Sequence, residues 1–253
     1  MLKKIKNILI IIGDFTIFQF SVVLSLRGIG KRRNQIVDQM ERIGYDSLLL
    51  ISITAGFTGL VTAVQASYLT NGYIPPNLIG VLVGKSTMIE LAPVLTALVL
   101  AGKVGASIAA EIGTMKVSEQ LDSLLSMAIE PSDYLYMPRV IAGCIMVPIL
   151  TIYANLIGIL SAFALSVIKY NINGYTFFME LKNYFMPSNL WGGLIMAFFF
   201  GLFITMIGCF AGSKTQGGAQ GVGRVTTMTV VYSSIAILIL DFLVASVLLG
   251  VSN

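Results

Sequence analysis

Five long apolar segments dominate the chain, and each is long enough to cross a membrane as a helix. A bilayer core needs about 20 helical residues, because each residue adds about 1.5 Å of rise. Clusters of turn-forming residues separate the segments, as Pro75-Pro76 does after the first. The pattern predicts an all-α membrane protein with a five-helix core over residues 47–250. The predicted spans are Ser47–Leu69, Ser86–Ala110, Met137–Ile168, Asn189–Gly212 and Thr229–Gly250.

A further apolar stretch, residues 5–26, precedes these segments and differs from them in its flanks. Basic residues stand on both sides of it, and Asp14 and Gln19 interrupt it. A spanning helix would place one basic cluster outside, against the tendency of Lys and Arg to stay in the cytoplasm. We therefore expect a helix lying in the membrane interface within an N-terminal region, residues 1–45. A spanning helix and a cleaved signal peptide are the alternatives, although no small-residue cleavage site follows.

The positions of the basic residues predict the orientation. With a cytoplasmic N-terminus and five spans, all but three of the 16 lysines and arginines fall in the cytoplasm or at the inner end of a span. The exceptions are Lys85, Lys169 and Lys182. Because cytoplasmic loops carry an excess of Lys and Arg, this arrangement predicts an external C-terminus.

The amino-acid composition excludes several common kinds of catalytic site. The chain is 56% hydrophobic and only 11% charged, whereas soluble domains are about 25% charged. It has no histidine, which excludes histidine metal ligands and Ser-His-Asp triads. Cys144 and Cys209 lie in apolar runs and are expected to be small buried hydrophobes. We therefore predict no catalytic residue and no metal site, and basic residues crowded at the N-terminus favour a membrane over a nucleic-acid partner.

A short polar segment, Thr114–Ile129, connects the second and third predicted spans. Gly113 and Pro131 bracket it, and its apolar residues recur at the spacing of one helical face. Such an amphipathic helix either lies on the membrane or seats in a groove of a cytoplasmic partner, and periodicity does not choose between the two. The apolar face comprises Val117, Leu121, Leu124, Leu125 and Ala128.

Two features of the spans leave alternatives open. Small residues recur between Ala101 and Ala110, which in lipid allows close helix contact, either within the chain or with a second copy. Glu90 and Asp241 lie inside spans, where an uncompensated charge costs at least about 2.5–3.5 kcal/mol. Structural pairing, cation binding in an ion-coupled carrier, or an intramembrane acid dyad are the interpretations of these two carboxylates.

The Gly-rich stretch around Lys214 looks like a phosphate loop, but its spacing does not fit one. The G-x-x-x-x-G-K-[ST] pattern fails, and a membrane helix rather than a strand precedes it. We expect a close-packed cytoplasmic turn here.

Several blocks of the sequence resemble the MlaE/YrbE family of permeases. Residues 90–105, ELAPVLTALVLAGKVG, resemble the family pattern E-L-G/A-P-x-L-T-A-L…A-G-R/K-x-G. Residues 111–120, EIGTMKVSEQ, match E-I-G-T-M-x-V-[ST]-E-Q, and this block is highly specific. Later family blocks follow in order at Pro138-Arg139, Gly218–Thr227 and Leu240-Asp241. Members of this family are the permeases of ABC transporters in MCE-type lipid-transport systems.

The resemblance implies one permease domain over residues 1–253, acting as a homodimer in the bacterial inner membrane. It implies a cytoplasmic ABC ATPase dimer that binds ATP, so that this chain needs no cofactor, and an extracytoplasmic ring of MCE-domain proteins. The implied cargo is phospholipid, moved between the inner membrane and the periplasm or outer membrane. The implied lipid-site residues are Leu69, Tyr73, Glu90, Leu91 and Asp241. The residues expected to couple to the ATPase are Glu111, Thr114, Met115, Lys116, Glu119, Leu121 and Leu125.

Overall fold

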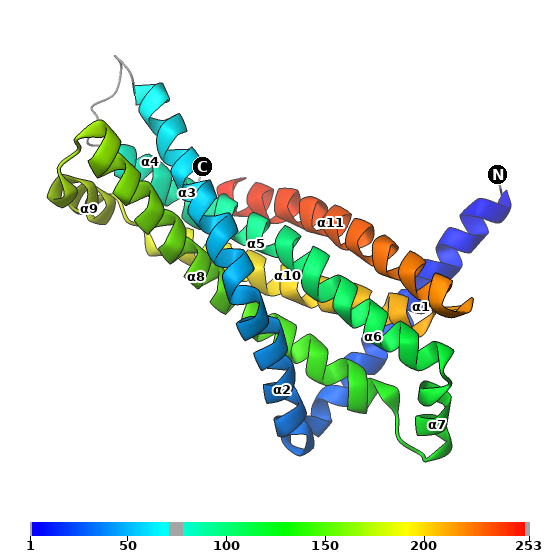
Figure 1. The fold of residues 1–253 in the computed structure, drawn as a ribbon. Coiled ribbons are helices and arrows are strands. Elements are labelled where there is room, and N and C mark those ends of the chain that lie inside the picture. The colour runs from blue at the N-terminus through cyan, green and yellow to red at the C-terminus, as the bar shows by residue number, and fades with distance from the viewer. Residues whose placement is uncertain (1, 71–77, 251–253) are drawn as a thin grey trace. The chain divides into compact units, whose positions relative to one another are not determined.

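The computed structural model of the chain describes residues 2–70 and 78–250, and it is helical almost throughout (Figure 1). No strand occurs in these two described ranges, which confirms the all-α prediction. The α-helices are α1 (Leu2–Ser25), α2 (Arg33–Gly44), α3 (Leu48–Thr70), α4 (Ile79–Ser86), α5 (Ala92–Leu100), α6 (Ala106–Val117), α7 (Gln120–Ser126), α8 (Met137–Tyr170), α9 (Gly174–Asn183), α10 (Pro187–Ser213) and α11 (Gly218–Gly250).

Shorter helical turns of other types connect several of these helices. The 3₁₀ segments η1 (Leu26–Arg32) and η2 (Tyr45–Ser47) flank α2. Three π-helical turns, η4 (Thr87–Leu91), η5 (Ala101–Gly105) and η6 (Ser132–Tyr136), precede α5, α6 and α8. Such π turns often occur at functional sites, and η4 contains both Glu90 and Leu91.

In the described part of the chain, five continuous helical stretches are long and apolar enough to cross a membrane, which confirms the predicted number of spans. The second stretch begins at Ile79 rather than Ser86, because Lys85 stays within the helix, where its stem can lie along apolar surface. The described apolar part of the N-terminal helix, Ile12–Ser25, is shorter than a span. The five stretches are Arg33–Leu69, Ile79–Val117, Ser132–Tyr170, Pro187–Ser213 and Gly218–Val247.

The chain divides into two compact units, which we call unit 1 and unit 2. Unit 1 comprises Met1–Ile43, Ala101–Gly143 and Leu202–Ile235. Unit 2 comprises Gly44–Leu100, Cys144–Gly201 and Ala236–Asn253. Unit 1 contains the connections that the charge pattern predicts to be cytoplasmic, and unit 2 contains those that it predicts to be external.

The core of unit 2 is built by α3, α4, α8 and α9. The helix α9 is an element that the hydrophobic pattern did not predict. Asn173 caps it by accepting a hydrogen bond from the Tyr175 backbone N–H at 2.9 Å, and Phe177 on its inner face is fully buried. The cluster comprises Ala63, Ala66, Ile79, Val83, Ile159, Ala162, Ile172 and Phe177.

The helices α3 and α8 lie in close backbone contact at Gly59. A Cβ atom added at Gly59 would collide with the carbonyl oxygen of Gly158. We expect Gly59→Ala to destabilise the protein by about 1–3 kcal/mol, because a backbone carbonyl cannot move aside as a side chain can. Thermal unfolding of the purified permease measures this. Gly56→Ala on the same helix is the control, since its Cβ would meet no atom closer than 3.5 Å; equal unfolding temperatures for the two variants would contradict the prediction.

The small residues of the second span serve internal packing in unit 1. Ala101, Gly105 and Ala109 are buried, and a Cβ at Gly105 would lie 3.3 Å from the Ile204 side chain of α10. The buried small residues of this segment therefore make contacts within the chain, which is one of the two interpretations that the sequence left open.

Candidate coupling site

The polar connection between the second and third spans forms a bent structure, which we call the handle (residues 111–129). The prediction of one helix over Thr114–Ile129 is wrong in detail. The helix α6 ends at Val117 and α7 begins at Gln120, with Glu119 in the left-handed conformation at φ 59°. The Ser118 hydroxyl donates to the Thr114 carbonyl at 2.8 Å, so a local side-chain bond competes with continuation of the helix.

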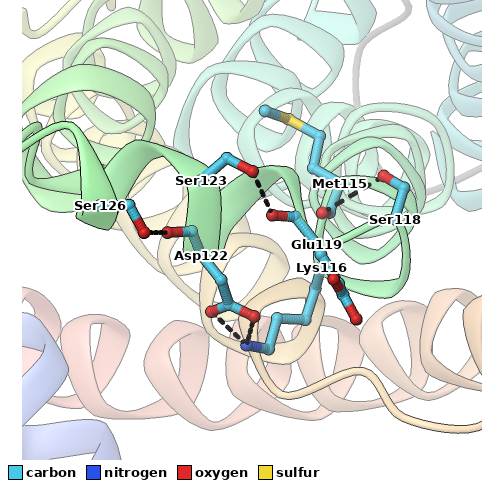
Figure 2. A network of polar contacts seen from close by, with 7 residues as sticks. All are labelled: Met115, Lys116, Ser118, Glu119, Asp122, Ser123 and Ser126. Carbon is cyan, nitrogen blue, oxygen red and sulfur yellow. Dashed lines mark hydrogen bonds and ion pairs between the residues drawn. The ribbon is translucent and has the colours of Figure 1, made fainter.

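An ion pair holds the two arms of the handle together across the bend. Lys116, in the last turn of α6, donates to both carboxylate oxygens of Asp122, in the first turn of α7, at 2.9 and 3.2 Å (Figure 2). Both side chains are partly exposed, so the pair is worth at most about 1 kcal/mol. Its main effect is on geometry, because it limits the angles at which α7 can leave α6.

Local hydrogen bonds complete the short helix α7. The hydroxyls of Ser123 and Ser126 donate to the carbonyls of Glu119 and Asp122, each at 3.0 Å (Figure 2). At its C-terminal end, the Ala128 and Ile129 amides bond back to Leu125 and Leu124, and Ala128 takes φ 58°. This is the Schellman arrangement, which satisfies the last carbonyls of a helix. The handle is therefore a defined structure rather than a loop.

A buried arginine, Arg139, holds the first residue of the handle, Glu111, and we call this region around Glu111 the base of the handle. Arg139, at the start of α8, forms an ion pair with the Glu111 carboxylate of α6 at 2.9 Å and donates to the Leu135 carbonyl at 2.8 Å. Its side chain is only 4% exposed. Arg42 of α2 lies 3.7 Å from the same Glu111 oxygen, at the surface. Glu111 thus joins three helices, all within unit 1.

The residues predicted to couple to an ATPase separate into an internal and an exposed set. Leu121 is 4% exposed and packs within the chain, so little of its side chain is accessible to a partner in this structure. Leu125, on the same predicted stripe, is 56% exposed, and Met127 beyond it is 69% exposed. Glu111 and Lys116 make the internal ion pairs, Met115 is half-buried, and Thr114 and Glu119 are exposed.

Asp122 and Arg139 hold the geometry of this candidate site, although the sequence analysis assigned neither of them a role. Asp122 lies in the polar connection between two spans, where the spacing of residues does not distinguish it from its polar neighbours. Arg139 gave a usable signal, because a charged residue at the start of an apolar run is costly and normally has a partner. The sequence could not indicate which carboxylate that partner was.

The predicted lipid-site residues lie mainly in unit 2, and Tyr73 lies outside the described residues. Leu69, near the end of α3, is 66% exposed, and Glu90 is also exposed. Asp241 is half-buried in α11. Leu91 lines a small cavity of about 10 Å³ together with Thr54, Thr58, Thr87 and Thr96. That space suits about one water molecule and is far too small for an acyl chain.

Comparison with known proteins agrees with this architecture. The family described as Permease MlaE matches residues 36–247. A probable ABC transporter permease protein of Rickettsia felis is 38% identical over 233 residues, which are 92% of this chain and 90% of the relative. A probable ABC transporter permease protein of Synechocystis sp. is 42% identical over 217 residues, 86% and 82% of the two chains. The intermembrane phospholipid transport system permease protein MlaE of Haemophilus influenzae is 32% identical over 249 residues, 98% and 95%. Since the family match reaches into all five membrane helices and includes the whole handle, this multi-pass membrane protein belongs to the MlaE family of ABC transporter permeases.

Proposed function

We propose that this chain is the permease that moves phospholipid between the bacterial inner membrane and the periplasm or outer membrane. A partner ATPase dimer supplies the energy by binding and hydrolysing ATP. The name of the Haemophilus influenzae relative supports the phospholipid cargo. The main observation that supports this proposal is the handle. An ion pair links its two helices, α6 and α7, and apolar side chains are exposed near its C-terminal end.

The handle is built so that a movement of the bound ATPase can be passed on to a membrane helix. Its arm α6 is continuous with the second span, so a displacement of α7 reaches that span through one helical stretch. The Lys116–Asp122 pair holds the C-terminal end of α6, and the buried Arg139 holds its middle through Glu111, so both contacts resist displacement of this helix. Leu125 and Met127 offer an apolar surface for a groove in the ATPase. Each copy of the permease in a homodimer would engage one ATPase subunit.

The proposed lipid site lies at the homodimer axis and opens outward toward the MCE-domain ring. Leu69, Tyr73 and Leu91 supply the apolar wall for the tails, and Glu90 with Asp241 supplies polar groups near the head. The exposure of Leu69 and Glu90 in the single chain supports this proposal, because both are free to meet a lipid or a second copy. A carboxylate repels phosphate, so Glu90 would bond amine or hydroxyl groups of the cargo.

Reconstitution tests this function directly. The permease, its ATPase and the MCE protein in liposomes should transfer labelled phospholipid only when ATP is present and hydrolysable. Transfer that proceeds without ATP and follows an imposed ion gradient would instead identify an ion-coupled carrier that uses Glu90 and Asp241.

Photo-crosslinking tests the position of the lipid site. A photoreactive amino acid at Tyr73 or Leu91 should capture phospholipid in membranes at a yield several-fold above that at Ile10. Ile10 is the control, because it is exposed on the N-terminal helix and meets bulk lipid. Capture is measured by mass spectrometry of the purified adducts. Equal yields at all three positions would exclude the outward-facing site and leave Glu90 a structural role.

A further inference from the structure

Unit 1 contains a polar cavity of about 190 Å³ beside the base of the handle. One wall is a polar face of α2, with Gln35, Asp38, Gln39 and Arg42 at helical spacing. The opposite wall is Glu111 of α6 together with residues 134–139, which lead into α8. One water molecule needs about 10–15 Å³ on this measure, so the cavity can hold a small polar group.

Two side chains that line the cavity each carry a buried polar atom with no hydrogen-bond partner in the described part of the chain. The two atoms are the Arg139 Nε, on a side chain that is 4% exposed, and the Gln35 Oε1. The first is a donor that needs an acceptor, and the second is an acceptor that needs a donor. Buried polar groups are normally satisfied, and each unsatisfied one carries a desolvation cost. A guest that reaches both atoms through a small shift of these side chains must therefore both accept and donate hydrogen bonds.

The cavity is also lined by side chains of both charges. Two guanidinium groups, on Arg42 and Arg139, and two carboxylates, on Asp38 and Glu111, line it. A simple anion would meet the carboxylates, and a simple cation would meet the guanidiniums. A zwitterion with separated charges can pair with both kinds of group at once.

We propose that this cavity binds the head group of a zwitterionic lipid that carries a phosphate and a primary ammonium, as in phosphatidylethanolamine. The phosphate accepts from Arg139 and Arg42, and the ammonium donates to Gln35 and Asp38. By the predicted orientation, the cavity lies at the cytoplasmic end of the first and third spans, at the level of the inner head groups. The site is distinct from the outward-facing cargo site and does not depend on the identity of the cargo.

Occupancy of this cavity would act on the handle. Glu111 is both part of the lining and the anchor of α6 to Arg139. A head group that bonds to Arg139 and Arg42 ties α2 and α8 together around the base of α6. A ligand bound there thus stabilises one position of the handle, and we expect the inner-leaflet lipid composition to affect coupling to the ATPase.

The experiment compares head groups on the purified full-length permease in detergent. The melting temperature and lipid retention by native mass spectrometry are followed as phosphatidylethanolamine, phosphatidylcholine or phosphatidylglycerol is added. We expect phosphatidylethanolamine to bind at least tenfold more tightly than the other two. Phosphatidylcholine lacks the N–H donors, and phosphatidylglycerol lacks the cation. Soluble glycerophosphoethanolamine is a separate arm, and binding as strong as that of the lipid would assign the site to a soluble zwitterion.

Two variants and a control connect the binding to this cavity. Gln35→Met and Arg42→Gln should each weaken phosphatidylethanolamine binding about tenfold while the protein without added lipid stays folded, since both side chains are only partly buried or exposed. Gln220→Met, at an exposed position in unit 1 outside the cavity, should leave binding unchanged. Equal binding of the three lipids, undiminished binding by both variants, or a high-resolution map showing water only in the cavity would overturn the proposal.

Discussion

Leu125→Asp is expected to release the partner ATPase while the permease stays folded and inserted in the membrane. Leu125 is 56% exposed on α7, so an aspartate there meets solvent in the isolated chain. In an apolar groove of the partner, the same carboxylate would be buried without a counter-charge. Loss of an interface anchor costs about 2 kcal/mol or more, which corresponds to a loss of affinity of roughly 30-fold. Co-purification of the ATPase with tagged permease measures the effect.

The matched control for this variant is Val37→Asp. Val37 is an exposed apolar residue on α2, within the same unit as the handle but outside it. It should leave ATPase recovery at the wild-type level. If Leu125→Asp also recovered the full amount of ATPase, the exposed end of the handle would not be the coupling surface.

Leu121→Asp is a less informative variant, although Leu121 belongs to the same predicted stripe. Leu121 is buried within the chain, so an aspartate there would disrupt the handle itself. ATPase release by that variant would therefore not distinguish a lost contact from a lost structure.

The second large effect is expected for Glu111→Leu, which should destabilise the permease by about 3 kcal/mol. The substitution leaves the Arg139 guanidinium buried without its ion-pair partner, and breaking a buried pair from one side costs about 3–5 kcal/mol. The lower end applies because the Glu111 side chain is partly exposed. Thermal unfolding in detergent is the measurement. Glu41→Leu, at an exposed position on α2, should change stability by no more than about 0.5 kcal/mol.

A double variant separates the loss of the pair from the loss of a carboxylate. Glu111→Leu combined with Arg139→Met removes both charges and should regain much of the lost stability, because apolar side chains can replace a buried ion pair. A double variant less stable than Glu111→Leu alone would show that Arg139 holds the base through other contacts, such as its bond to the Leu135 carbonyl.

The hydrophobic pattern was sufficient to predict the five membrane helices and the all-α class. Each span is a local property, since a helix in lipid satisfies its own backbone and needs only enough consecutive apolar residues. The family also followed from local blocks, above all residues 111–120. The ends of the spans were less predictable, because helices such as the one beginning at Ile79 continue beyond the apolar region.

The geometry of the handle and of its base depended on tertiary structure. Periodicity placed Leu121 and Leu125 on one face, but the bend at Ser118 and Glu119 and the packing of α7 bury one and expose the other. The partner of Arg139 is on a different helix, and nothing in local spacing selects Glu111 for it. Contacts of this kind form only when helices distant in sequence pack together, because the cost of burying a charge is offset only by a partner that the fold brings within reach.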